Sequence, residues 1–186
     1  MKDKFKPSVC GVGFVGEGAH KSTDKAYRIW HHMLGRCYDT EHQKLNPSYI
    51  GCAVSEDWHN LQVFGDWFVL NYIDGFQLDK DILKQGNKVY SSDTCIFVSR
   101  QINSLFIDRK EGRGKYKLGV CWSKTGKKFL SHCRAHGRLV YLGCYTSEHK
   151  AHEAYKVFKY KLIVAASVTQ REPIKTAMIN YVIPEY

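Results

Sequence analysis

The spacing of apolar side chains predicts helices in the first part of the chain. Residues 24–38 carry an apolar stripe with a period of 3.6 residues, and a second helix is expected to begin at Ser55, whose hydroxyl can cap the backbone. The residues expected to face the core from these two helices are Tyr27, Trp30, Leu34, Cys37, Trp58, Leu61, Phe64 and Phe68. Between the two helices, Asn46, Pro47 and Gly51 indicate a loop.

The pattern then indicates two short strands and another helix. The strands are expected over residues 78–83 and 94–98, with a turn at Gly86 and Asn87 between them. A helix over residues 99–107 follows and carries Asn103.

Beyond residue 116 the hydrophobic period changes to two, which is typical of strands. Strands are expected over residues 117–122, 128–134 and 139–144. Turns at residues 124–126 and 135–137 join them. Ser147 then opens a long amphipathic helix, whose expected inward residues are Ala151, Ala154, Tyr155, Phe158 and Leu162. The predicted fold class is therefore α+β, with a three-stranded antiparallel sheet packed on one helix. One helix covers one face, so the other face meets solvent or a partner.

A charged, glycine-rich stretch without long apolar residues, 109–115, indicates a linker. It separates an expected domain over residues 1–108 from a second over residues 116–168. Residues 169–186 form a tail, which is predicted to pack on the body as a strand or to form a dimer contact.

Composition narrows the class of protein. No run approaches the roughly 18–20 apolar residues that a membrane span needs, so no membrane partner is expected. No hydrophobic stretch follows the basic residues 1–7, so no secretory signal is expected. The seven cysteines are odd in number and lack Cys-x-x-Cys spacing, which favours reduced thiols and a cytoplasmic location.

Charge is unevenly distributed along the chain. The whole chain has 28 basic and 18 acidic residues, a formal net charge of +10. Residues 1–110 have a net charge of +1, whereas residues 111–186 have a net charge of +9. Such a local positive field attracts polyanions and favours nucleic-acid binding. The alternative is a solvated basic face that keeps the protein in solution.

Alternation along the predicted strands assigns their side chains to two faces. Phe129 is expected against the helix, so His132 and Arg134 point to the open face, together with Cys121, Ser123 and Tyr141. A basic sheet of this width fits the major groove of double-stranded DNA, where an arginine can bind guanine. The residues expected to contact phosphates at the edges are Lys117, Lys124, Lys127, Lys128 and Arg138.

Residues 117–161 resemble the DNA-binding domain of plant ethylene-response-factor (APETALA-type) proteins. The resemblance rests on Leu118-Gly119-Val120, Phe129, Tyr141-Leu142-Gly143-Cys144-Tyr145-Thr146 and Ala151-x-x-Ala154-Tyr155. In that family the sheet reads the major groove with arginines and tryptophans. By position, the resemblance implies base-reading residues at Cys121, Ser123, His132, Arg134, Leu139 and Tyr141. Arg134 alone keeps the family's arginine and Tyr141 keeps an aromatic, so a different target sequence is expected.

The first part of the chain resembles phage-encoded HNH homing endonucleases that carry the same DNA-binding domain at their C-terminus. The ordered series begins with Trp30-x-x-Met33-Leu34-x-Arg36-Cys37-Tyr38, Tyr49-x-Gly51-Cys52-x-Val54, Trp58-x-x-Leu61 and Phe64-x-x-Trp67. It continues with Leu78-Asp79-Lys80-Asp81, Gly86-Asn87, Tyr90-Ser91 and Cys95-x-Phe97-Val98. The resemblance implies a ββα-metal-type region before the linker.

The HNH resemblance also implies a catalytic centre. Asp79 and Asn103 would be ligands of Mg²⁺, and Asn87 would fix the connecting loop. The position of the general base holds Lys80 in place of histidine. A lysine amine has an ordinary pKa of about 10.4 and keeps its proton at neutral pH, so we expect Lys80 to pair with acidic neighbours or a phosphate. His59 could approach only through the fold, and an ordinary solvated turn at Asp79 stays an alternative.

These observations predict a protein that binds double-stranded DNA in a sequence-specific way and derives from a phage HNH homing endonuclease. Its cleavage is expected to be impaired or lost, so that it acts as a transcriptional repressor by occupying its site, with no cofactor required for binding. A phage or mobile element would encode the protein, which is expected in the cytoplasm of the bacterial host. Two-fold symmetry in its DNA site would indicate a homodimer. The alternatives are an active Mg²⁺-dependent nuclease that nicks or cuts phage DNA and, third, an RNA binder.

Overall fold

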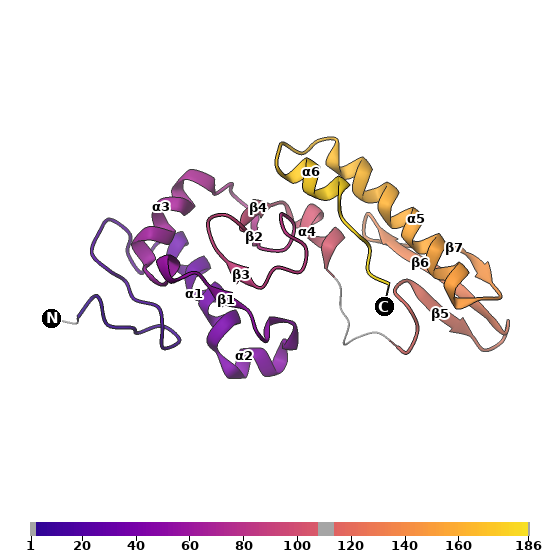
Figure 1. Cartoon of the computed structure of the whole chain (residues 1–186), viewed down its shortest axis with the longest axis horizontal. Helices are drawn as coiled ribbons and strands as arrows, with labels where there is room; N and C mark the ends of the chain where they lie inside the picture. The colour runs from indigo at the N-terminus through magenta and orange to yellow at the C-terminus, as the bar shows by residue number, and fades with distance from the viewer. Residues whose placement is uncertain (1–2, 108–113, 186) are drawn as a thin grey trace. The chain divides into compact units, whose positions relative to one another are not determined.

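The computed structural model describes residues 3–107 and 114–185 and confirms the α+β class (Figure 1). The chain divides into two compact units, Met1–Asn103 and Ser104–Tyr186. The division falls inside helix α4 (Arg100–Phe106), before the predicted linker. Of that linker, residues 109–113 lie outside the described residues, so its conformation stays a prediction.

The first unit combines helices with two small sheets. Its elements up to α4 are α1 (Lys25–Tyr38), α2 (Thr40–Leu45), η1 (Pro47–Tyr49), β1 (Ala53–Val54), η2 (Glu56–His59), α3 (Leu61–Asn71), β2 (Gln77–Asp79), β3 (Val89–Tyr90) and β4 (Ile96–Val98). β2 and β4 pair antiparallel with Leu78 opposite Phe97, whereas β1 and β3 pair parallel. The expected order of strand, strand and helix before the linker is therefore present as β2, β4 and α4.

The core of the first unit forms where α1 packs on α3. Trp30 and Trp58 are buried as predicted, and the Trp30 indole Nε1 donates a hydrogen bond to the Trp58 carbonyl oxygen over 2.7 Å. That bond satisfies the polar atom of a buried indole. Leu34, Leu61 and Phe64 complete this part of the core.

Two boundaries and one helix of the first unit differ from the prediction in instructive ways. Ser55 makes no side-chain capping bond; a short 3-10 turn follows it, and α3 begins after Asn60, whose side chain accepts a hydrogen bond from the Gln62 backbone. α2 was not predicted because it buries no side chain and so lacks an apolar stripe. β2 ends at Asp79, since its carboxylate accepts hydrogen bonds from the next backbone N–H groups and turns the chain.

The second unit is a sheet of three strands with α5 lying along it (Figure 1). Its elements are β5 (Val120–Ser123), β6 (Lys128–Ala135), β7 (Arg138–Tyr145), α5 (Glu148–Ser167) and α6 (Ile174–Ile179). The strands lie in the order β5-β6-β7 and are antiparallel, as predicted. The register of β6 and β7 shifts between Ser131 and His132, which marks a β-bulge.

The tail belongs to the second unit. It packs on the body, as one of the two predicted alternatives has it, but as α6 and a following segment that forms no strand among the described residues; the dimer contact stays a prediction. Ile183 of this segment is buried against Cys133 of the sheet and Tyr155 of α5. Among the described residues, no helix is both long enough and apolar enough to span a membrane.

Candidate nucleic-acid interface

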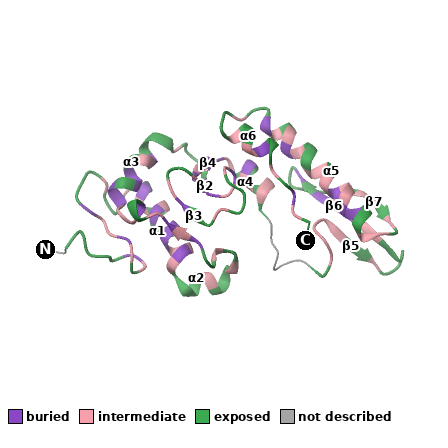
Figure 2. Ribbon diagram, in the orientation of Figure 1, coloured by how far each residue is buried: buried purple, intermediate pink, exposed green. Residues whose placement is uncertain are grey.

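The helix-facing side of the sheet is where the sequence pattern placed it. Ser131, Cys133 and Ala135 of β6 are buried, and α5 packs against this strand. The opposite side is open to solvent, and parts of β5 and β7 are exposed (Figure 2). The alternation that separates buried from solvated residues in a one-sided sheet therefore holds along β6.

The open face, as we call it below, consists of side chains from all three strands. Residues directly opposite one another in antiparallel strands share a face. The register places Cys121 and Cys144 on either side of Leu130, Ser123 opposite Lys128, His132 opposite Tyr141, and Arg134 opposite Leu139. The predicted residues Cys121, Ser123, His132, Arg134, Leu139 and Tyr141 thus come together on one face.

Cys144 belongs to this face, although sequence reasoning missed it. Simple alternation from Leu139 and Tyr141 would place residue 143 outward and Cys144 inward. The bulge adds one residue, Leu142, and so moves Cys144 to the open face. The only sequence signal for this change is Gly143, whose φ of +127° is unfavourable for other residues.

Two apolar side chains and one guanidinium dominate the end of the open face near the β6–β7 turn. Leu139 is 63% and Tyr141 57% exposed. The Arg134 Nη1 donates a hydrogen bond over 3.1 Å to the Gly137 carbonyl oxygen in the turn. That bond uses one of five guanidinium N–H donors and holds the group at the rim of the face.

Lysines surround the open face at the β5–β6 turn. Lys124, Lys127 and Lys128 are exposed there, and Arg138 is exposed at the other turn. Residues 116–147 contain no aspartate or glutamate, so nothing acidic within the sheet neutralises these charges. The local field of the sheet is therefore positive.

Lys117 is an exception among the predicted phosphate-binding residues. Its Nζ donates a hydrogen bond over 2.6 Å to the backbone carbonyl of Glu185 and lies 3.7 Å from that residue's Oε2. Lys156 of α5 also pairs with the Glu185 carboxylate, and the buried His152 Nε2 lies 3.8 Å from it. Lys117 thus fastens the tail through Glu185, and its contact with a phosphate stays a prediction.

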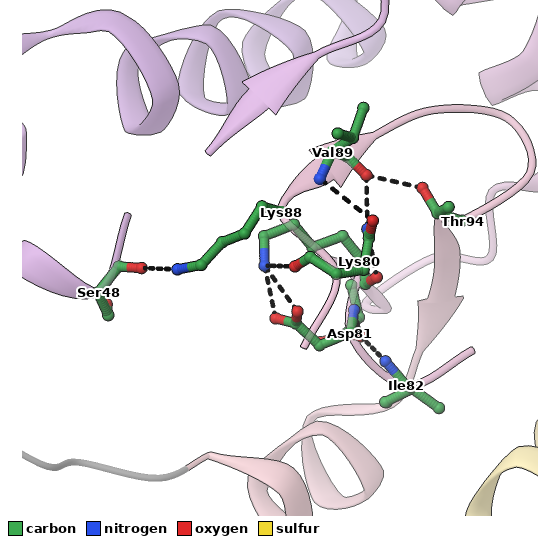
Figure 3. A network of polar contacts seen from close by, with 9 residues as sticks. Ser48, Lys80, Asp81, Ile82, Lys88, Val89 and Thr94 are labelled. Atoms are coloured by element: carbon green, nitrogen blue, oxygen red, sulfur yellow. Dashed lines mark hydrogen bonds and ion pairs between the residues drawn. The ribbon is translucent and has the colours of Figure 1, made fainter. Parts of the chain in front are cut away.

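Lys80 lies inside the first unit and is only 6% exposed (Figure 3). Its ammonium donates to both carboxylate oxygens of Asp81, each over 2.7 Å, and to the Asn87 carbonyl over 2.9 Å. The ammonium also lies 5.7 Å from the centre of the Tyr90 ring. The three N–H donors of the amine match these three acceptors, so the side chain acts as a cross-link within the loop. Pairing with an acidic neighbour, one of the two predicted roles, is what the structure has.

The two implied metal ligands serve local structure. Asp79 Oδ1 accepts hydrogen bonds from the backbone of Asp81 over 2.8 Å and of Ile82 over 2.7 Å. Burial is the main cause that raises the pKa of Asp79 above its ordinary value. Asn103 Nδ2 donates to Gln77 Oε1 over 2.9 Å, at the opposite end of β2 from Asp79.

Asn87 fixes the connecting loop, as the HNH resemblance implies. Its Nδ2 donates to the carbonyl oxygens of Lys80 over 2.9 Å and of Val89 over 2.6 Å. Its Oδ1 accepts from the Val89 backbone over 3.2 Å. His59, the other histidine considered, bonds through Nε2 to the Tyr38 hydroxyl over 3.2 Å, so its ring is engaged at α1.

The groups implied for a hydrolytic Mg²⁺ centre are engaged in hydrogen bonds within the first unit. Asp79 Oδ1 holds two backbone N–H groups, the Asn103 amide holds Gln77, and burial raises the pKa of the Asp79 carboxyl above its ordinary value. The base position is filled by an ammonium that is fully hydrogen-bonded. Among the described residues, no three His, Cys, Asp or Glu side chains come together in a group that could hold a metal ion.

Comparison of the chain with protein-family models, with curated proteins and with solved structures gave no match.

Proposed function

We propose that the chain binds double-stranded DNA with the open face of its sheet in the major groove. The observation that carries this proposal is an uncovered sheet face with lysines at its edge and no acidic residue in the sheet segment. Three strands about 4.8 Å apart make a surface roughly 10 Å wide, which matches a major groove about 12 Å wide.

The side chains of the open face divide into two roles. Arg134 is suited to guanine, whose O6 and N7 accept two guanidinium hydrogen bonds, and Leu139 to the methyl group of thymine. Lys124, Lys127, Lys128 and Arg138 lie at the turns and are suited to phosphates, which position the sheet without reading sequence. His132 and Tyr141 lie between these groups and add polar contacts to base edges.

We infer further that the protein acts by occupying its site, as a repressor does, rather than by cutting. The supporting observation is the hydrogen bonding of Lys80, which leaves no lone pair to take a proton from water. In this view an HNH-type region derived from a phage homing endonuclease is retained as a scaffold. An active Mg²⁺-dependent nuclease is the competing function.

One experiment separates the two functions. Purified full-length protein is used to select binding sites from random duplexes, and the selected duplex and supercoiled phage DNA are then incubated with protein and Mg²⁺. We expect retention of the duplex and no nicks. Nicking that requires Mg²⁺ and disappears in Asp79→Ala and Asn103→Ala would establish the nuclease, and failure to select any duplex would contradict DNA binding itself.

A further inference from the structure

The seven thiols of the chain differ sharply in their access to solvent. Cys37, Cys52, Cys95 and Cys133 are buried, and burial raises the pKa of Cys37 and of Cys95 to about 12. Burial also raises the pKa of the partly exposed Cys10. The two exposed cysteines, Cys121 and Cys144, both lie on the open face and both pair in register with Leu130.

The two exposed thiols have different neighbours. Cys121 Sγ lies 3.7 Å from Nδ1 of His132 on the adjacent strand. Cys144 instead shares a hydrogen bond with Tyr141, which raises the pKa of that phenol. A neutral imidazole nitrogen can accept a thiol proton near pH 7, whereas a phenol, with an ordinary pKa of about 10, keeps its own proton there. Of these two thiols, Cys121 therefore has a general base beside it within the described part of the chain.

We propose that Cys121 is a modification site that reacts with low-molecular-weight disulfides such as oxidised glutathione. His132 Nδ1 takes the proton of the Cys121 thiol, and the resulting thiolate attacks one sulfur of the disulfide. A new S–S bond forms to Cys121 as the original S–S bond breaks. The departing glutathione thiolate takes the proton back from the imidazolium, so that no further oxidant or reductant is needed.

The position of Cys121 favours a small external partner over an internal one. Cys121 and Cys144 are separated by two strand spacings, about 10 Å, and a disulfide requires Cα atoms no more than about 7 Å apart. The two thiols of the open face therefore cannot join each other. The carboxylates of glutathione would instead meet the positive field of the lysines at the β5–β6 turn.

The consequence rests on the proposed function. A glutathione attached at Cys121 would cover the β5 side of the open face, next to His132, and bring negative charge against phosphate. We therefore infer that the mixed disulfide blocks DNA binding reversibly, and that a thiol reductant restores it.

The site itself is tested without DNA. Full-length wild type, Cys121→Ser, Cys144→Ser and His132→Asn are exposed to oxidised glutathione, and the rate and position of adducts are measured by mass spectrometry. We expect the adduct at Cys121, a wild-type rate in Cys144→Ser, and a rate lower by at least about tenfold in His132→Asn. Equal reaction at Cys144, an unchanged rate in His132→Asn, or a disulfide-linked dimer in place of the adduct would overturn the proposal.

The consequence is tested by titrating the selected duplex with modified and unmodified wild type. We expect the modified protein to lose at least about tenfold in affinity, equivalent to 1.4 kcal/mol, and dithiothreitol to restore it. If Cys121 reacts with the help of His132 but the adduct binds DNA unchanged, the modification site stands and the open face is not the DNA-binding surface. Failure of the modification site and failure of the proposed DNA-binding surface therefore give different results.

Discussion

At the scale of single residues, Lys80 shows how one buried ammonium holds a whole loop together. Its buried ammonium joins Asp81 to the carbonyl of Asn87, where the HNH resemblance implies a histidine that activates water. A charged group buried with matched partners becomes a structural requirement, because removing it leaves those partners unpaired.

We therefore expect Lys80→Ala to lower the free energy of unfolding by about 2 kcal/mol, since the Asp81 side chain is nearly half exposed and recovers part of its hydration. Urea denaturation measures this change. Lys84→Ala, an exposed lysine of the same loop, is the matched control and should unfold as wild type does. Equal stability of the two variants would contradict a structural role for Lys80.

The raised pKa of Asp79 leads to a second prediction at this scale. Its pKa is raised in the folded state, so its contribution to stability is fully present below the unfolded pKa of about 3.9 and is lost as the pH rises through the folded value. Asparagine can still accept the two backbone hydrogen bonds without carrying a charge. Asp79→Asn should therefore gain stability relative to wild type as the pH rises above about 4.

The measurement is the difference in unfolding free energy between Asp79→Asn and wild type over a series of pH values. A variant that becomes less stable than wild type at neutral pH would show that the ionised carboxylate is favoured there. Such a result, together with an increase in wild-type melting temperature on adding Mg²⁺, would support the metal site that we argue against.

At the scale of elements, the bulge in β7 decides which side chains reach the open face. Gly143→Ala would hold a side chain at φ +127° and bring its Cβ 2.9 Å from the Tyr145 hydroxyl oxygen. We expect a loss of about 1–3 kcal/mol in unfolding free energy. Gly35→Ala on α1, where a Cβ meets nothing within 4 Å, is the control and should be neutral or stabilising. Thermal unfolding measures both variants, and equal melting temperatures would contradict the requirement for glycine at the bulge.

The tail is a second element whose role can be measured. Ile183 is 7% exposed among side chains of the sheet and α5, so Ile183→Ala should destabilise the protein by about 2 kcal/mol. Val182, its 69% exposed neighbour, provides the control in Val182→Ala. A melting temperature that is the same for both variants would mean that the tail does not belong to the core of the second unit.

The sequence predicted the elements whose signal is repeated along the chain. The apolar stripe of α1 and the alternation of β6 come from burial on one side, so the periods of 3.6 and two were readable. α2 buries nothing and left no pattern, and the cap of α3 at Asn60 depended on a turn that periodicity does not report. The pairing of Lys117 with Glu185 joins residues far apart in the chain, which no local pattern can indicate.

At the scale of the whole molecule, charge separates the two units. Residues 1–103 carry 12 basic and 12 acidic side chains, whereas residues 104–186 carry 16 and 6, so the entire net charge of +10 belongs to the second unit. The unit with the open sheet face is thus also the one that carries the positive charge. The salt dependence of DNA binding should accordingly be set by the second unit.

The central claim is that the open face of the sheet reads duplex DNA, and titrations of the selected duplex with variants of this face test it most directly. Arg134→Ala should weaken binding by about 1–3 kcal/mol and relax the preference at one base pair, whereas Lys128→Ala should weaken all duplexes alike and lower the salt slope by about one. Arg171→Ala, which removes an exposed charge from the tail, should bind as wild type does. Wild-type affinity in both Arg134→Ala and Lys128→Ala would contradict the claim.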